Sequence, residues 1–346
     1  MDGFADLDTR LASHECWCLP LEAGEFVRSH VIACINSLRQ RYPQAKVILG
    51  AGAECIIEQL EAISGWKVLA NSPEVVTQLD TPDIFFNALK KMQIPFPSLQ
   101  SGAKPGSGNW LFKREKSCGG MGVSRESIEG ATGYWQQEMS GTAVSVLCIA
   151  DGQEFQLIGI NEQYSTSVFD GYPYVYQGAL ANAKIDKLLT DKTDGYIDKI
   201  IKHFNLKGVF SIDMLWVDQH ANGALYVLEI NPRISASFEL YERVNPELNL
   251  VDAHIRVCEG ERLRDIEFND SQSGYLIVYA KDDCQISPQL IWPEWVKDRP
   301  EACRQISKFE PICSVHADQI ENESDLYLLL QKRANQVIDI LNQQVI

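Results

Sequence analysis

The most constraining feature of the sequence is a pair of apolar segments that carry polar residues at regular positions. The first segment, 209–216, reads Val-Phe-Ser-Ile-Asp-Met-Leu-Trp, and the second, 225–231, reads Leu-Tyr-Val-Leu-Glu-Ile-Asn. The polar segment 218–223 between them is typical of a turn, so we expect two antiparallel strands. Because the midpoint of positions 213 and 229 falls inside this turn, the pairing would place Asp213 roughly opposite Glu229.

These acidic residues predict a cation site. Glu229 and Asn231 are two residues apart on one strand and therefore face the same side. Two opposed carboxylates repel each other unless a cation lies between them, and hard oxygen ligands suit Mg²⁺. We predict that Asp213, Glu229 and Asn231 hold Mg²⁺ or Mn²⁺. In the alternative, the carboxylates are solvated on an exposed sheet face, and the residues that point inward are Ile212, Met214, Leu228 and Ile230.

A glycine-rich loop provides a candidate anion site. The glycine loop, residues 113–123, follows an expected strand at 110–113 and contains Gly119, Gly120 and Gly122. Glycines let backbone N–H groups approach an anion closely, and Lys113 and Lys116 would add positive charge. The spacing is not that of a Walker loop. A hairpin loop with surface lysines is the alternative interpretation.

The two features together predict nucleoside triphosphate chemistry outside the P-loop class. A phosphate-binding loop and a divalent-cation site are the parts that such chemistry requires. Arg233 lies two residues beyond Asn231 and would share its face if the chain stays extended past Pro232. It could then stabilise negative charge on a transferred phosphoryl group.

Composition excludes other classes of protein. The 346 residues include 31 Lys and Arg against 47 Asp and Glu, a net charge of −16, which argues against a nucleic-acid partner. We expect no membrane span and no signal peptide. The ten cysteines lie mostly in apolar runs, as reduced core thiols of a cytoplasmic protein do. A metal site at His14, Cys16 and Cys18 is the less favoured alternative to core packing.

The chain divides into three expected regions, 1–75, 76–255 and 256–346. In the first, strand patterns at 16–19 and 46–49 alternate with helix patterns, which predicts a small parallel sheet. In the second, Thr81 and Pro82 open a helix, and Asp151-Gly152 joins two strands. The third has a strand at 275–279 and ends in a helix from about residue 324.

The segment 228–233, Leu-Glu-Ile-Asn-Pro-Arg, with the upstream Asp213 and the glycine loop, resembles the ATP-grasp superfamily. The closer similarity is to predicted ATP-dependent carboligases related to biotin carboxylase, and it extends over most of the chain. It implies an α/β (α+β) ATP-grasp fold. The three regions would be an N-terminal Rossmann-like pre-ATP-grasp domain, a two-lobed ATP-grasp domain, and a C-terminal α/β segment that completes the core.

The resemblance also implies a reaction. ATP would phosphorylate a small-molecule carboxylate to give an acyl phosphate and ADP, and an amine would then form the amide. Related enzymes join glutamate to an amine in one-carbon cofactor biosynthesis, so glutamate with tyramine, as in methylofuran-type pathways, is a specific candidate. The alternatives are a bicarbonate-using carboxylase and a non-catalytic ATP-binding regulatory protein. The chain could form a homo-oligomer.

The resemblance also implies a role for each site residue, according to its position in the matching motifs. Arg233 would be catalytic, and Asp213, Glu229 and Asn231 would hold the metal. The nucleotide would contact Lys113, Lys116, Gly119, Gly120 and Gly122, together with Gln136, Gln137 and Glu138 of the hinge-like segment 134–141. The substrate-binding candidates are Gly52, Glu54, Gln177, Ser235 and Ser237.

Two short segments have competing interpretations. Gly50-Ala51-Gly52 after an expected strand could line a second-substrate pocket or be a plain turn. A dinucleotide motif would need its third glycine at Cys55. A polar aromatic stretch could line the acceptor pocket or form a surface loop: Gln163, Tyr164, Tyr176, Gln177 and Gly178.

The sequence departs from the family pattern in two places. The helix before Ile94-Pro95 has no phosphate-binding lysine early enough, and no acidic residue follows Gly141 to bind ribose. Arg114 or Lys116 would have to supply these contacts.

Overall fold

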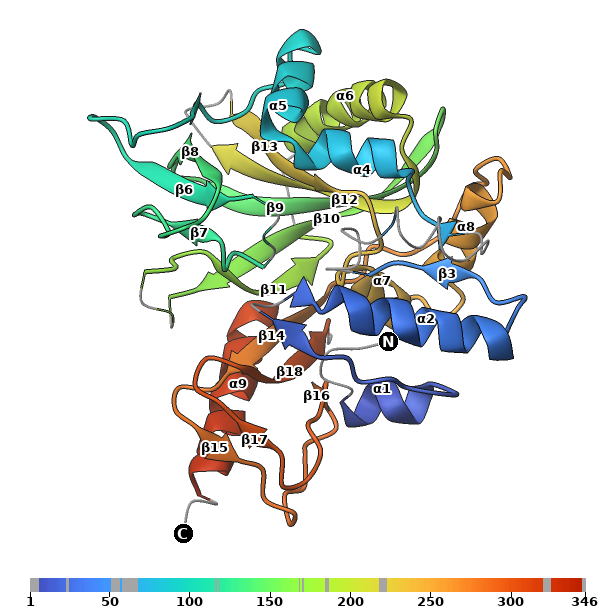
Figure 1. The fold of residues 1–346 in the computed structure, drawn as a ribbon, viewed down its shortest axis with the longest axis vertical. Helices are drawn as coiled ribbons and strands as arrows, with labels where there is room; N and C mark the ends of the chain where they lie inside the picture. Colours follow the sequence, from blue (N-terminus) through green and yellow to red (C-terminus); the bar gives the residue numbers. More distant parts are fainter. Residues whose placement is uncertain are drawn as a thin grey trace.

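The computed structural model describes residues 6–22, 25–50, 57, 68–115, 117, 119–167, 169, 171–183, 187–217, 223–319 and 325–343. Figure 1 shows a large central sheet, a smaller sheet beside it, and helices packed around both. The arrangement matters for function because the predicted site residues come from both sheets.

The N-terminal part contains a short parallel pair of strands. Its elements are α1 (Leu7–Ala12), β1 (Leu21–Glu22), β2 (Glu25–Phe26), α2 (Arg28–Arg41), β3 (Val47–Ile48) and β4 (Val68–Leu69). β3 and β4 form the expected small parallel sheet, but β4 takes the place of the strand expected at 16–19. Val31, Cys34 and Ile35 of α2 are buried at helical spacing and pack with Leu19 and Leu49.

The small sheet contains the start of the glycine loop. Its strands are β5 (Leu99–Gln100), β6 (Trp110–Arg114), β7 (Val123–Ser124) and β8 (Gly133–Gln137), in the order β5-β8-β6-β7. Two helices precede it, α4 (Pro73–Asp80) and α5 (Pro82–Lys91). Strand β6 confirms the strand expected at 110–113.

The large sheet joins the middle and the end of the chain. Its strands are β9 (Thr142–Asp151), β10 (Phe155–Thr166), β11 (Val175–Ala181), β12 (Lys207–Val217), β13 (Ala224–Asn231), β14 (Ser273–Tyr279), β16 (Val296–Lys297) and β18 (Pro311–Asp318). Their order is β13-β12-β9-β10-β11-β14-β18-β16. Both hairpins expected from the sequence, β9 with β10 and β12 with β13, are confirmed as antiparallel pairs.

Helices cover both faces of the large sheet. The remaining helices are α6 (Lys187–Phe204), α7 (Phe238–Val244), α8 (Leu250–Cys258) and α9 (Leu326–Asn342), and a separate pair of strands is β15 (Cys284–Gln285) with β17 (Gln305–Ile306). α5 and α6 pack against Val146 and Ile212, whereas α7 and α8 pack against Leu147 and Val209. This alternation between neighbouring residues is the strand period of two. α9 packs on β14 and β18.

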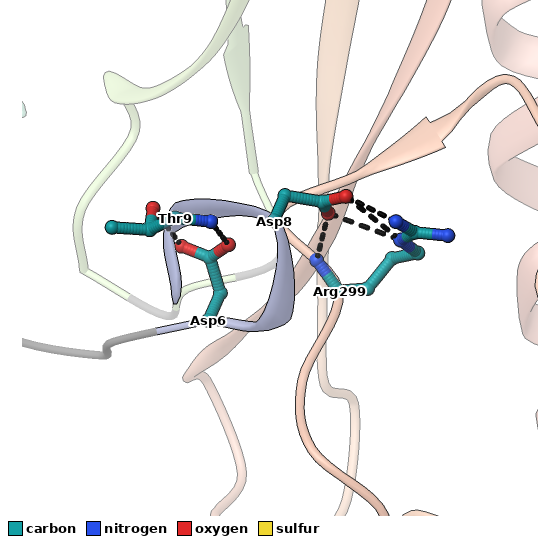
Figure 2. A network of polar contacts seen from close by, with 4 residues as sticks. All are labelled: Asp6, Asp8, Thr9 and Arg299. Carbon is teal, nitrogen blue, oxygen red and sulfur yellow. Dashed lines mark hydrogen bonds and ion pairs between the residues drawn. The ribbon is translucent and has the colours of Figure 1, made fainter. Parts of the chain in front are cut away.

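The first described helix is attached to the last third of the chain. Asp6 caps α1 by accepting a hydrogen bond from the Thr9 backbone N–H at 2.9 Å. Figure 2 shows that Asp8 of the same helix binds Arg299 through both the guanidinium and the backbone N–H of that residue. The Leu7 N–H also donates to the Arg299 carbonyl, at 2.8 Å. Charged and backbone contacts thus join α1 to the segment that follows β16.

Three expectations need correction or restriction. Thr81 precedes α5, but its hydroxyl donates to the Thr77 carbonyl of α4 and does not cap α5. The apolar run at 16–19 forms only a single bridge instead of a strand. The cysteines among the described residues are free, but Cys18 and Cys303 are exposed and are not core thiols. Among the described helices, none combines the length and the hydropathy that a membrane span requires.

Candidate active site

Asp213 and Glu229 occupy opposite positions on β12 and β13, as the sequence predicts. Ser211 faces Asn231 in the same pairing, and a bulge follows Asp213. Because directly opposed residues project from the same face, the two carboxylates and the amide of Asn231 share one surface of the sheet. Glu229 is exposed, whereas Asp213 and Asn231 are half-buried.

Two amides hold the Asp213 carboxylate. The Gln163 Nε2 donates to Asp213 Oδ1, and the Asn231 Nδ2 donates to Asp213 Oδ2, both at 3.2 Å. Burial and the nearby Glu229 charge raise the pKa of Asp213 to about 7, although a hydrogen bond from Ser145 and the charge of Arg233 oppose this rise. Ionised Asp213 is therefore an unfavourable neighbour for Glu229 unless a cation is present.

Arg233 reaches the site by a different route from the one expected. The chain does not stay extended past Pro232, because the Arg233 N–H donates to the Asn231 carbonyl at 2.8 Å and closes a three-residue turn. The side chain nevertheless returns to the site, where its Nη2 donates to Asn231 Oδ1 at 3.0 Å. An amide oxygen has two lone pairs, so this contact leaves one for a cation.

Lys113 connects the two sheets. It lies on β6, and its Nζ is 3.9 Å from Glu229 Oε2 on β13. Burial works against its charge, but Tyr134, Glu229 and Asp213 raise the pKa of Lys113 above its usual value. The ammonium group is therefore charged and lies beside the carboxylates, where phosphate oxygens could also reach it.

The donor set fits a hard divalent cation. In the part of the chain that the structure describes, no three His, Cys, Asp or Glu side chains gather as a complete metal site. The cluster here has two carboxylates and one amide oxygen from Asn231, which is the incomplete oxygen set that suits Mg²⁺ shared with phosphates. The raised pKa of Asp213 agrees with this assignment, because a cation would favour its ionised form.

The glycine loop packs on the large sheet. The Gly119 carbonyl accepts a hydrogen bond from the Tyr176 N–H of β11 at 2.9 Å. Gly120 has φ +78°, and a Cβ there would lie 1.9 Å from the Tyr174 carbonyl oxygen. At Gly122, a Cβ would meet the Ser117 hydroxyl at 2.0 Å. Gly120 and Gly122 therefore have packing reasons to be glycine, in addition to the predicted phosphate role. Lys116 lies outside the described residues.

A cleft of about 930 Å³ opens between the two sheets. Its lining includes residues at the start of β6 and just before it, in the connection from β8 to β9, and in β10: Asn109, Trp110, Met139, Ser140, Gly141 and Gln163. Gln163 both lines the cleft and donates to Asp213, so the cleft adjoins the carboxylate pair. The size is ample for a nucleotide, because ligand pockets usually range from about 300 to 1,000 Å³.

The hinge-like residues differ in their surroundings. Gln136 is buried, and its Nε2 has no hydrogen-bond partner among the residues that the structure describes. Strand alternation places it on the same face as Lys113 and Tyr134. Gln137 is exposed. The Glu138 carboxylate lines the cleft but already accepts hydrogen bonds from Arg125 at 2.6 Å and Tyr174 at 2.8 Å. Hydrogen bonding to Arg125 is the main cause that lowers the pKa of Glu138.

The substrate-binding candidates are only partly brought together. Ser235 and Ser237 follow Arg233, and their hydroxyls lie 3.1 Å apart. Gln177 is the extra residue at the irregularity between β10 and β11. Gly52 and Glu54 lie outside the described residues, so their predicted role remains a prediction.

Sequence reasoning missed two contributors to the site. Ser145, which hydrogen-bonds Asp213, was visible as a lone polar residue within the apolar run of β9. Gln163 was predicted to line an acceptor pocket or to lie on a surface loop. It lies in β10, where it lines the cleft and also donates a hydrogen bond to Asp213, a contact that the sequence did not predict. Its contact depends on a strand that is not adjacent to β12, which no local pattern reveals.

Known proteins resemble the chain in sequence and fold. Residues 84–237 match the family model of the ATP-grasp domain. The carbamoyl phosphate synthase large chain of Clostridium perfringens is 27% identical over 130 residues, which are 38% of this chain. The matched segment is 12% of that protein, so the chain spans only about one eighth of its curated relatives.

Solved structures match over nearly the whole chain. The biotin carboxylase domain of 2-oxoglutarate carboxylase from Hydrogenobacter thermophilus, a dimer in complex with MgADP, ADP and bicarbonate, has a TM-score of 0.71 at 12% identity. That match covers 96% of this chain and 81% of the other. Phosphoribosylamine–glycine ligase from Thermotoga maritima has a TM-score of 0.66 at 15% identity, covering 96% and 88%.

The family match spans the small sheet, the cleft and the carboxylate pair, and the structural likeness extends to both ends of the fold. Residues 84–237 therefore form an ATP-grasp domain, and the whole fold is like that of the biotin carboxylases.

Proposed function

We propose that this protein is an ATP- and Mg²⁺-dependent ligase that joins a carboxylate to an amine and releases ADP and phosphate. The observation that carries the proposal is the opposed pair Asp213 and Glu229 with Lys113 beside it. A divalent cation at the pair would offset its repulsion and would hold ATP phosphates near the lysine. ATP would supply the phosphoryl group that activates the carboxylate.

Each part of the site has a task in this reaction. Lys113 and the glycine loop bind the phosphates, and the buried Nε2 of Gln136 gains an acceptor from the nucleotide. A carboxylate oxygen of the substrate attacks the terminal phosphorus as ADP leaves. The amine nitrogen then attacks the acyl carbon, and phosphate leaves as the amide forms. Arg233 stabilises the negative charge on the transferred group.

A more specific proposal concerns the identity of the two substrates. The likeness to phosphoribosylamine–glycine ligase, a protein named for an amine and an amino acid, supports a carboxylate–amine ligase. Glutamate with tyramine, as in methylofuran-type cofactor biosynthesis, is our first candidate pair. A cytoplasmic location and a homo-oligomer remain predictions, the latter suggested by the dimer of the Hydrogenobacter domain.

A bicarbonate-using carboxylase is the second candidate. It is favoured by the likeness to a biotin carboxylase domain whose structure contains bicarbonate. The two candidates differ in the co-substrate that releases ADP, because only the ligase needs a carboxylate and an amine together.

The test is coupled ADP release from ATP and Mg²⁺ with glutamate, tyramine, both, or bicarbonate alone, followed by a screen of amino acids and amines. If the protein is a ligase, ADP is released only when both co-substrates are present, and the Glu229→Ala substitution abolishes this release. Glu267→Ala, at an exposed residue outside the site, is the control. Bicarbonate-dependent release without an amine favours the carboxylase. ATP binding without ADP release under any condition favours a regulatory protein.

A further inference from the structure

Asn71 lies between the N-terminal part of the chain and the large sheet, and it is almost fully buried. It lies two residues after the end of β4. Its Nδ2 donates to the carbonyl of Pro232 at 2.9 Å and to the carbonyl of Lys207 at 3.1 Å, and its Oδ1 accepts from the Lys207 N–H at 2.8 Å. A single side chain thus satisfies three backbone groups that are distant in the sequence.

The partners of Asn71 belong to the two strands of the site: one begins β12, and the other directly follows β13. Lys207 is the first residue of β12, the strand that carries Asp213. Pro232 lies between Asn231, the proposed metal ligand, and Arg233, the proposed catalytic residue. Asn71 therefore joins the start of one site strand to the turn that follows the other.

The contact with Pro232 fixes the direction of the Arg233 backbone. Because the peptide group is planar, a carbonyl held in place also fixes the N–H and the Cα of the next residue. The Arg233 N–H in turn donates to the Asn231 carbonyl. Proline has no N–H of its own, so the carbonyl is the one backbone group through which Pro232 itself can be held.

We infer that Asn71 is a positioning residue for the cation and phosphoryl sites, acting through the Asn231-Pro232-Arg233 turn. The inference rests on the proposed function for the roles of Asn231 and Arg233. It assigns to the end of the N-terminal part an effect on metal binding through this turn, and not only a contribution to stability.

His254 provides a matched control at the same junction. Its Nε2 lies 2.9 Å from the Leu69 carbonyl of β4, and its Nδ1 accepts from the Val209 N–H of β12 at 2.9 Å. It is buried like Asn71 and also joins β4 to β12, but no described hydrogen bond of His254 reaches the turn. A variant at His254 therefore weakens the junction without releasing Pro232.

The experiment compares the wild type, Asn71→Ala, Asn71→Asp and His254→Ala. Asn71→Asp keeps an acceptor for the Lys207 N–H but loses both donors. Asn71→Ser, which keeps one donor, replaces Asn71→Ala if the latter does not fold by circular dichroism. Three quantities are measured: thermal unfolding, ATP binding without divalent cation, and Mn²⁺ binding to the ATP-saturated protein. ADP release is followed separately.

The inference predicts that Mn²⁺ affinity falls roughly tenfold in the Asn71 variants, the usual range for residues that orient metal ligands. Cation-free ATP binding should not change. His254→Ala should unfold at a lower temperature yet bind Mn²⁺ as the wild type does. The inference is wrong if the Asn71 variants bind Mn²⁺ as tightly as the wild type does. It is also wrong if His254→Ala loses as much Mn²⁺ affinity as the Asn71 variants lose.

Failure of the proposed function gives a different result. If the wild type binds Mn²⁺ with ATP but releases no ADP with any co-substrate, the ligase reaction is wrong, and the Mn²⁺ affinities still decide the role of Asn71. If the wild type binds no Mn²⁺ at all, both the proposed function and the inference about Asn71 are wrong.

Discussion

Asp213 and Glu229 face each other across β12 and β13, and the pKa of Asp213 is raised to about 7 by burial and by the Glu229 charge. Without a cation, the pair is most stable when Asp213 carries a proton. A cation bound by both carboxylates must displace that proton, so metal binding and proton release are linked.

The first prediction is that the apparent Mg²⁺ affinity falls as the pH drops below about 7. The pKa of Asp213 is higher in the folded protein than in the unfolded chain, so this group favours folding below about pH 4 and loses that contribution as the pH rises through about 7. Mg²⁺ should therefore raise the unfolding temperature more at about pH 8 than at about pH 6. Differential scanning fluorimetry in the presence of ATP measures this.

The control for this linkage is Asp213→Asn, which removes the titrating carboxyl. The difference between the two pH values should disappear in this variant. An Mg²⁺-induced rise that is equal at both pH values in the wild type would mean that Asp213 does not bind the cation.

The second prediction compares two neighbouring glycines. Gly120→Ala places a Cβ 1.9 Å from the Tyr174 carbonyl, whereas Gly119→Ala meets nothing within 4 Å, although both residues have positive φ. Gly119→Ala should cost about 1 kcal/mol from backbone strain alone, and Gly120→Ala should cost more and detach the loop from β11. Limited proteolysis between residues 113 and 123 and thermal unfolding report these effects. Equal behaviour of the two variants would contradict this packing.

The third prediction concerns Lys113. Lys113→Met should weaken ATP binding at least about tenfold, since a hydrogen bond to a charged group contributes about 1.5–3 kcal/mol. Lys202→Met is the matched control, because Lys202 pairs with Asp198 on the surface of α6. Isothermal titration calorimetry measures both. If Lys113→Met binds ATP as tightly as Lys202→Met does, Lys113 does not contact the phosphates.

The fourth prediction concerns the attachment of α1 shown in Figure 2. Burial opposes the charge of Asp8, but its hydrogen bonds with Arg299 lower the pKa of Asp8 overall. The contribution to stability is therefore present above about pH 4 and is lost at lower pH. Asp8→Asn should destabilise the neutral-pH protein by about 1–2 kcal/mol, measured by urea unfolding.

Asp252→Asn serves as the comparison for Asp8→Asn, because Asp252 pairs with Arg256 on the exposed surface of α8. Such a helix pair contributes about 0.3–0.5 kcal/mol. The Asp8 prediction is wrong if the two variants lose the same stability at neutral pH.

Local sequence patterns were sufficient to predict the centre of the site. The opposition of Asp213 and Glu229 follows from the spacing of two apolar strands around one turn, and the structure has this register. The hairpin at Asp151-Gly152 was predictable for the same reason. Both depend on residues close in the sequence, where strand period and turn chemistry determine the pairing.

Long-range contacts were not predictable. Asn71 meets Lys207 and Pro232 across more than a hundred residues, and Gln163 reaches Asp213 across strands that are not adjacent. The turn at Pro232 also departed from the extended chain expected, because a backbone hydrogen bond competes with extension there. These contacts arise from how sheets and segments pack, which periodicity does not encode.

The most direct test of a divalent-cation site at Asp213 and Glu229 is the dissociation constant of ATP with and without Mg²⁺, measured by calorimetry on the wild type, Glu229→Gln and Glu267→Gln. We expect Mg²⁺ to tighten ATP binding in the wild type and in Glu267→Gln, but to have little effect in Glu229→Gln. The Glu229→Gln protein should remain folded, because that side chain is exposed. An equal effect of Mg²⁺ in all three proteins would place the cation elsewhere and contradict the account.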